Sequence, residues 1–184
     1  MRIGQKYITG TFAADQWVKI YESILSSAIT SITISSLDGD TDEEYLLIYK
    51  FINGYNGTSN FVLRVNNETT NANRGYQCII GSEIYINSYR SISTEYYIGY
   101  GTALNNVSIG KDIIFAKSGY LRTAITEYVP DIFGTTLYGI QIIAQVWSNT
   151  ADNITSLVIT ERDAHLNALG VGTSIELYKK KYKS

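Results

Sequence analysis

The chain has 184 residues, of which 45% are hydrophobic and 17% charged, a length and composition that suit one globular domain with a single core. Its formal net charge of −2 gives no electrostatic drive for binding nucleic acid, which depends on neutralising phosphates. The single cysteine, Cys78, excludes an internal disulfide and any cysteine-rich zinc site. We therefore expect no nucleic-acid partner and treat Cys78 as a small buried hydrophobe.

The first segment, residues 1–14, carries no clean hydrophobic period and is expected to form an N-terminal arm or a short edge strand. It lacks the apolar segment of a secretory signal. No run in the chain reaches the ~20 apolar residues that a membrane-spanning helix needs. We therefore expect synthesis in the cytoplasm and no membrane insertion.

Residues 16–25 allow two interpretations. Trp17, Ile20, Tyr21 and Ile24 have helical spacing, with Asp15 as a possible N-cap, yet the same segment also alternates as a strand. Its β-branched and aromatic residues favour extended structure. We predict a strand.

The most informative stretch is 31–52. Ile32 and Ile34 alternate with Ser or Thr, an acidic turn follows at 38–42, and a second run covers 45–52. Because both sides of the second run are mostly apolar or amphipathic, it is expected inside a sheet rather than at an edge. We predict a central hairpin, with the rest of the chain built to cover it.

Short strand patterns separated by turn residues continue to the end of the chain. The predicted strands are 60–65, 77–80, 83–86, 112–117, 120–128, 138–147, 154–160 and 174–178. Such spacing is typical of a β-sandwich or barrel and not of βαβ units. We predict an all-β fold with one antiparallel β-sandwich over 15–180, long Tyr- and Asn-rich loops, and a basic, solvated tail at 181–184.

Residues 87–106 are rich in Tyr, Ser and Gly and are predicted to form a long exposed excursion. Its tyrosines are the candidate ligand or partner contacts: Tyr89, Tyr96, Tyr97 and Tyr100. Aromatic rings flanked by Asn and Ser can stack on sugars, and they can equally bury against a neighbouring subunit. Packing against another subunit is the favoured interpretation.

Catalytic and metal-binding patterns are sparse. His165, near Glu161, is the only histidine available as a general base, and a structural or surface role is favoured for it. Asp38, Asp40 and Asp42 alternate as in a calcium-binding EF-hand, but Glu43 stands where that loop needs glycine. Tyr49 stands where it needs its closing carboxylate. We expect a solvated turn, no catalytic residue, no cofactor and no enzymatic activity, while calcium in another geometry stays open.

Two motifs resemble a known module. The pattern I-x-I-S-x-L-D-G-x-T-D-x-x-Y at 32–45 and the closing LGVGTSIELY at 169–178 are similar to a β-sandwich module of tailed-bacteriophage virion proteins. Such modules occur in capsid-decorating, head-fibre and tail-fibre proteins. The resemblance implies a jelly-roll-like sandwich with its first and last strands close together, and it supplies no catalytic residues.

The same resemblance implies a function in the virion. We expect a non-enzymatic structural protein that binds other virion proteins and copies of itself. Because the sequence has only a short arm and no fibrous shaft, a decoration subunit on the capsid or tail surface is favoured. The alternative is a receptor- or glycan-binding tail-fibre or head-fibre domain that contacts a host surface glycan.

Overall fold

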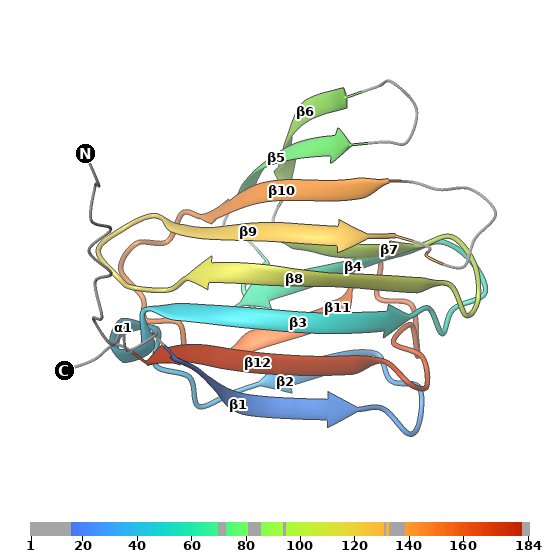
Figure 1. The fold of residues 1–184 in the computed structure, drawn as a ribbon, viewed down its shortest axis with the longest axis horizontal. Helices are drawn as coiled ribbons and strands as arrows, with labels where there is room; N and C mark the ends of the chain where they lie inside the picture. Colours follow the sequence, from blue (N-terminus) through green and yellow to red (C-terminus); the bar gives the residue numbers. More distant parts are fainter. Residues whose placement is uncertain are drawn as a thin grey trace, which may run out of the picture.

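The computed structural model describes residues 16–69, 73–80, 86–93, 95–130, 132 and 139–181. Within these residues the fold is nearly all-β, with two antiparallel sheets packed face to face (Figure 1). The predicted all-β fold, a single antiparallel β-sandwich, is confirmed. Its only described helix, α1 (Gly39–Asp42), is a single turn, and no described helix has the length and apolar character to cross a membrane.

The larger sheet faces the viewer in Figure 1, and the smaller sheet lies behind it. The larger sheet has the order β1 (Gln16–Ile24), β12 (Ser174–Lys181), β3 (Glu44–Ile52), β8 (Val107–Phe115), β9 (Arg122–Val129), β10 (Ile140–Trp147), β5 (Asn73–Ile80) and β6 (Ile86–Ser93). The smaller sheet has the order β2 (Ser31–Ile34), β11 (Leu157–Glu161), β4 (Ser59–Val65) and β7 (Tyr96–Gly101). The first described strand, β1, pairs with the last, β12.

The core lies between the sheets, and β3 shows why. Its residues Tyr45, Leu47, Tyr49 and Phe51 alternate along the strand, and all are buried. The Tyr49 and Phe51 rings stack at 4.5 Å between centroids, and Phe51 stacks on Phe61 of the smaller sheet at 4.8 Å. Pairing with β12 and β8 places β3 inside its sheet, as predicted, and β1 confirms the strand interpretation of 16–25.

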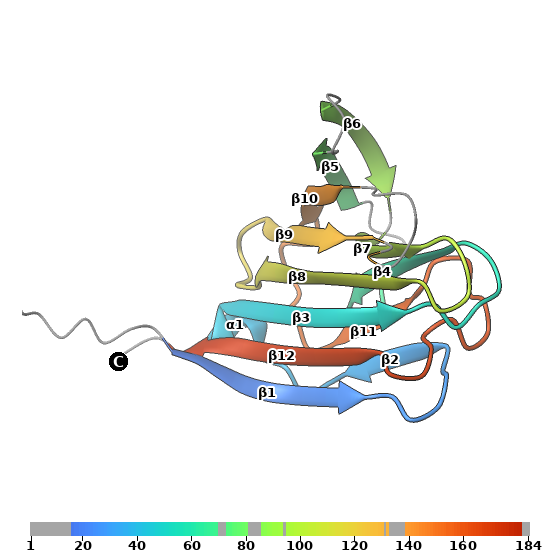
Figure 2. The ribbon, with the colours of Figure 1, turned by 45° about the vertical axis from the view of Figure 1, so that its right-hand side comes forward.

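The predicted hairpin over 31–52 is wrong. β2 and β3 belong to different sheets, and the acidic turn with α1 carries the chain from one layer to the other (Figures 1 and 2). Gly39 makes this crossing possible, since a Cβ there would lie 3.0 Å from the Ala116 carbonyl oxygen. Alternation identifies the buried face of each strand, but it does not say which sheet the strand joins.

The predicted long excursion at 87–106 is also wrong, since β6 and β7 occupy most of it. Ile98 and Tyr96 of β7 are fully buried in the sandwich, so this segment has the alternation of a strand. Residues 1–14, most of the strand predicted at 83–86, and residues 182–184 lie outside the described residues. Cys78 lies in β5, where only the backbone is described.

Candidate functional site

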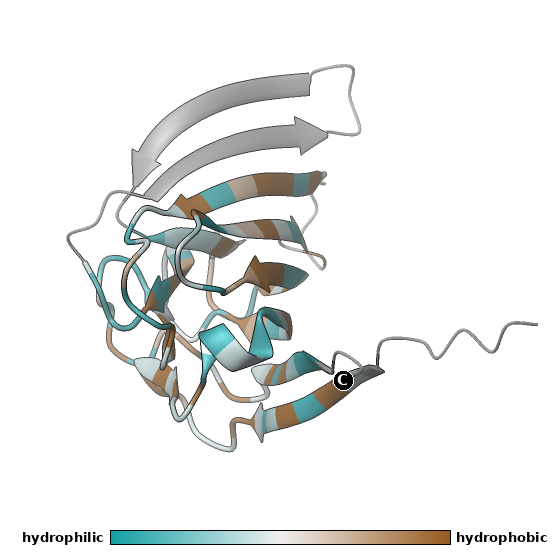
Figure 3. Ribbon diagram, turned by 90° about the vertical axis from the view of Figure 1, so that its left-hand side faces the viewer, coloured by the Kyte–Doolittle hydropathy of each residue, from teal (hydrophilic) through white to brown (hydrophobic). Residues whose placement is uncertain are grey.

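The outward-facing side of the larger sheet is the most unusual surface of the described structure. We call "outer face" the outward residues of β1, β12, β3, β8, β9 and β10. Figure 3 views the sandwich nearly along its strands, with apolar segments alternating with polar ones. Large apolar side chains on this face are at least a third exposed: Ile24, Ile48, Ile109, Phe115, Ile125 and Ile140. An extended apolar surface of this kind marks a binding interface in soluble proteins.

The register arranges these residues in rows across the strands. One row joins Leu46 of β3, Ile113 of β8 and Ile125 of β9, and it continues to Ala144 of β10. Rows of aliphatic side chains on adjacent strands form a continuous ridge, because cross-strand neighbours have their Cβ atoms ~5 Å apart. The outer face is therefore one connected surface.

One end of the outer face is hollowed into a groove of about 700 Å³. Its apolar lining includes Ile24, Ile48, Ile109, Val129 and Ile140. At the other end Phe115 borders a smaller depression of about 180 Å³, together with the exposed Tyr120 and Leu121. Both ends are therefore recessed, and the groove at the Ile109 end is the larger of these two.

Ion pairs formed within the face lie among its apolar residues. Lys19 lies 3.0 Å from Glu22 and 3.1 Å from Glu176, and hydrogen bonds to these two carboxylates raise the pKa of Lys19. Lys111 lies 3.0 Å from Glu127. Lys180 of β12 lies 3.1 Å from Glu44. Pairing lowers the cost of covering these charges with a partner.

The candidate tyrosines have different surroundings. Tyr89 lies in β6, where only the backbone is described, opposite Gln77 of β5. Tyr96 is fully buried and donates its hydroxyl to the Arg122 carbonyl at 3.3 Å, which removes it from contact with any ligand. Tyr97 and Tyr100 are half-buried against the core. The structure therefore does not bring the four tyrosines together into an exposed aromatic site.

Tyr97 and Tyr100 instead mark where β7, an edge strand, is joined to the larger sheet. The Gln145 side chain of β10 accepts from the Tyr97 N–H and donates to the Tyr97 carbonyl. Ser108 of β8 accepts from the Tyr100 N–H and donates to its carbonyl. These side chains replace the missing neighbouring strand and protect an edge that could pair with another chain.

Gln145 continues into the centre of the sandwich. It donates to the Thr126 hydroxyl at 2.8 Å, and Thr126 lies opposite Asp112 of β8 in the register. Asp112 is fully buried, and this burial raises the pKa of its carboxyl to about 8, with a smaller opposing effect from the Thr126 hydroxyl. The carboxyl is therefore protonated at neutral pH. No sequence signal pointed to this buried acid, because Asp112 stands in an ordinary strand pattern.

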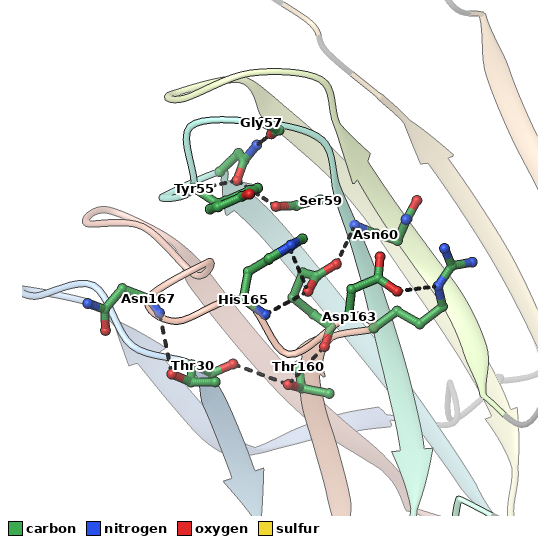
Figure 4. A network of polar contacts seen from close by, with 12 residues as sticks. Thr30, Tyr55, Gly57, Ser59, Asn60, Thr160, Asp163, His165 and Asn167 are labelled. Carbon is green, nitrogen blue, oxygen red and sulfur yellow. Dashed lines mark hydrogen bonds and ion pairs between the residues drawn. The ribbon is translucent and has the colours of Figure 1, made fainter.

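A second polar cluster lies at one end of the smaller sheet (Figure 4). The fully buried Glu161 accepts from the backbone N–H groups of Asn60 and His165, and its Oε2 lies 3.1 Å from His165 Nδ1. The His165 ring stacks on Tyr55 with centroids 3.9 Å apart. Among the described residues, no hydroxyl or thiol hydrogen-bonds to His165. The arrangement therefore orders the loop after β11 and supplies no nucleophile.

The acidic turn uses its carboxylates within the fold. Asp38 accepts from Thr41 and Asn153, and these hydrogen bonds, with Thr41 first, lower its pKa. Hydrogen bonds from the side chain and then the N–H of Ser118 lower the pKa of Asp40, and Asp42 accepts from the Tyr45 hydroxyl. No group of three or more His, Cys, Asp or Glu residues in the described part of the chain could hold a metal ion. The described turn has the contacts of a structural element.

Comparison with known proteins finds no matching family model, no similar curated protein and no similar solved structure. The resemblance to phage virion modules therefore stays a prediction made from the two motifs. The outer face is the candidate site that the geometry itself supplies.

Proposed function

We propose that this protein is a non-enzymatic structural subunit that binds other proteins through the outer face. The observation that carries this proposal is the connected apolar surface over β3, β8, β9 and β10, whose isoleucines are exposed although they stand on the rigid strands of a sandwich. Such a surface is costly to leave in water and gains free energy when another protein covers it.

The particle in which it acts is proposed from the sequence motifs. With the pattern at 32–45, the expected setting is a tailed-phage virion, with the protein as a decoration subunit on the capsid or tail surface. The elements that carry the motif support a structural role, because the acidic turn connects the two sheets and its carboxylates stabilise that crossing. Its partners would be other virion structural proteins and further copies of itself.

The proposal is tested by locating the protein in virions and then disrupting the outer face with a substitution. Quantitative mass spectrometry and imaging of purified virions should find many copies per particle. An Ile48→Lys variant should fold but be depleted from particles, because the lysine would be buried among apolar side chains at the contact. Leu166→Lys, at an exposed loop position outside the outer face, is the matched control and should be incorporated normally. Absence of the wild-type protein from virions would refute the proposal.

A second candidate function, the binding of a host surface glycan, is favoured by one observation. The Tyr55–His165 stack is half-buried, and the Arg162 guanidinium lies 5.8 Å from the centroid of the Tyr97 ring. Partly exposed aromatic rings beside a guanidinium suit sugar rings and acidic sugars. Saturable binding on a glycan array that Tyr55→Ala and Tyr97→Ala both abolish would support this function. Unchanged binding by both variants would reject it.

A further inference from the structure

We infer that the outer face is covered by the outer face of a second copy of this chain, related by a two-fold axis that runs across the strands. This inference rests on the proposed assembly function and deepens it by naming the partner. Four properties of the face support it: its charge balance, its size, the register of its rows and its shape.

The charges of the outer face are balanced, which suits contact with a copy of itself. Equal numbers of lysines and glutamates point outward: Lys19, Lys50, Lys111 and Lys180 against Glu22, Glu44, Glu127 and Glu176. A lipid headgroup surface or a nucleic acid would favour a face of one sign. Two neutral faces meet without net repulsion.

The size of the face matches what a stable dimer needs. Six strands at ~4.8 Å spacing and four outward rows at ~6.6 Å cover roughly 29 Å by 26 Å, or about 750 Å². A standard protein–protein interface covers about 800 Å² on each partner. A second twisted sheet is also the natural cover for a sheet face, since aligned sheets with the same twist pack ~10 Å apart.

The register selects the direction of the axis. An axis across the strands, midway along the face, opposes Glu44 of one copy with Lys50 of the other, and Lys19 with Glu22. The same axis places Leu46 on Ile48 of the partner copy. An axis along the strands between β3 and β8 would instead oppose Glu176 with Glu127, which repel.

The shape of the face agrees with the same axis. The exposed Phe115 stands at one end of β8, and Ile109, which lines the 700 Å³ groove, stands near the other end. Rotation about this two-fold axis places each Phe115 over the groove of the partner copy. Each copy then gives and receives the same contact, as an isologous two-fold interface requires.

The test is a charge-reversal cycle on the full chain, read by analytical ultracentrifugation. Wild type should sediment as a dimer, and Lys50→Glu and Glu44→Lys should each weaken dimerisation at least about tenfold, because each opposes like charges. The double variant should return to within about threefold of wild type. Glu44 and Lys50 lie six residues apart on β3, about 20 Å, so this rescue cannot arise within one molecule.

The control variants are Ile48→Lys, which should abolish the dimer, and Leu166→Lys, which should leave it intact. Far-UV circular dichroism and urea unfolding establish that each variant folds. A monomeric wild type at several hundred micromolar, or single variants that dimerise like wild type, would overturn the inference. A double variant that stays as weak as the single variants would also overturn it.

The two proposals can fail separately. If wild type is monomeric but Ile48→Lys is lost from virions, the face binds another virion protein and only the dimer is rejected. If the charge cycle succeeds but virions lack the protein, the dimer stands and the proposed virion function is rejected.

Discussion

The two faces of the larger sheet are both rich in aliphatic side chains, but the polar groups on the two faces have different partners. On the inner face, Gln145 and Ser108 bond to the backbone of β7, and Asp112 is held protonated by burial. On the outer face, lysines pair with glutamates of the same face. Gln145 and Ser108 thus support the fold, whereas the outer pairs neutralise a surface that stays available. This difference agrees with the proposal that the outer face binds a partner.

The sharpest test of this comparison uses two positions on β3. Phe51 is fully buried between stacked aromatic rings, so Phe51→Ala should lower the free energy of unfolding by about 4 kcal/mol. Ile48, on the opposite side of the same strand, is 40% exposed, and Ile48→Ala should cost less than about 1 kcal/mol. Urea denaturation measures both values at several protein concentrations, because dimerisation adds to apparent stability. Equal losses would mean that the outer face is needed for folding itself.

The next effect concerns the buried acid of the inner face. Since the pKa of Asp112 is about 8 when folded and near 3.8 when unfolded, the folded protein keeps a proton that the unfolded chain releases in this range. The contribution of Asp112 to the free energy of unfolding is therefore greatest below about pH 4. It falls by about 1.4 kcal/mol per pH unit up to about pH 8.

Asp112→Asn should remove that loss and make the protein more stable at pH 7 by at least about 1 kcal/mol. Urea unfolding at intervals between pH 5 and pH 8 measures the two slopes. An unchanged slope in the variant would show that Asp112 is ionised in the folded protein. Glu127→Gln on the outer face is the matched control for removing one carboxylate from an exposed position.

The next test concerns the hydrogen bonds by which the inner face holds the edge of β7. Gln145→Leu keeps the side-chain volume but leaves the Tyr97 N–H and carbonyl without their partner, at a cost of about 2 kcal/mol. Hydrogen exchange should quicken at the Tyr97 amide and stay unchanged in β3. Uniform protection in the variant would contradict the role of Gln145 as a substitute strand.

The sequence predicted those features of the fold that depend on local pattern. The alternation of Tyr45, Leu47, Tyr49 and Phe51 identified the buried side of β3 and its place inside a sheet. The same pattern led to a false hairpin, because Ile32 and Ile34 face the core from the other sheet. Which strands pair depends on the packing of the whole chain. The hydrophobic period of a single segment carries no information about that packing.

The candidate site was less predictable for the same reason. Tyr96 and Tyr97 are neighbours in the sequence, yet one is fully buried and the other half-exposed, because successive side chains of β7 point to opposite sides. The outer face gathers Ile48, Ile109, Ile125 and Ile140 from four strands. Each of these residues also fits a core position in its own strand, so the exposed surface becomes evident only from the assembled sheet.

The last test compares an ion pair of the outer face with one in the smaller sheet, and the outer pair gives the smallest expected effect. Lys111 and Glu127 are about half exposed on the outer face, so Lys111→Gln should change the free energy of unfolding by less than about 0.5 kcal/mol. Arg64 and Glu95 form a pair with side chains 20% and 7% exposed, and Arg64→Gln should cost about 2 kcal/mol because it leaves a buried carboxylate without its cation. Urea unfolding at low and high salt separates the two pairs, since salt screens exposed charges more strongly. A large loss at Lys111 would show that the outer pairs hold the sheet together, and the functional contrast between the faces would then fail.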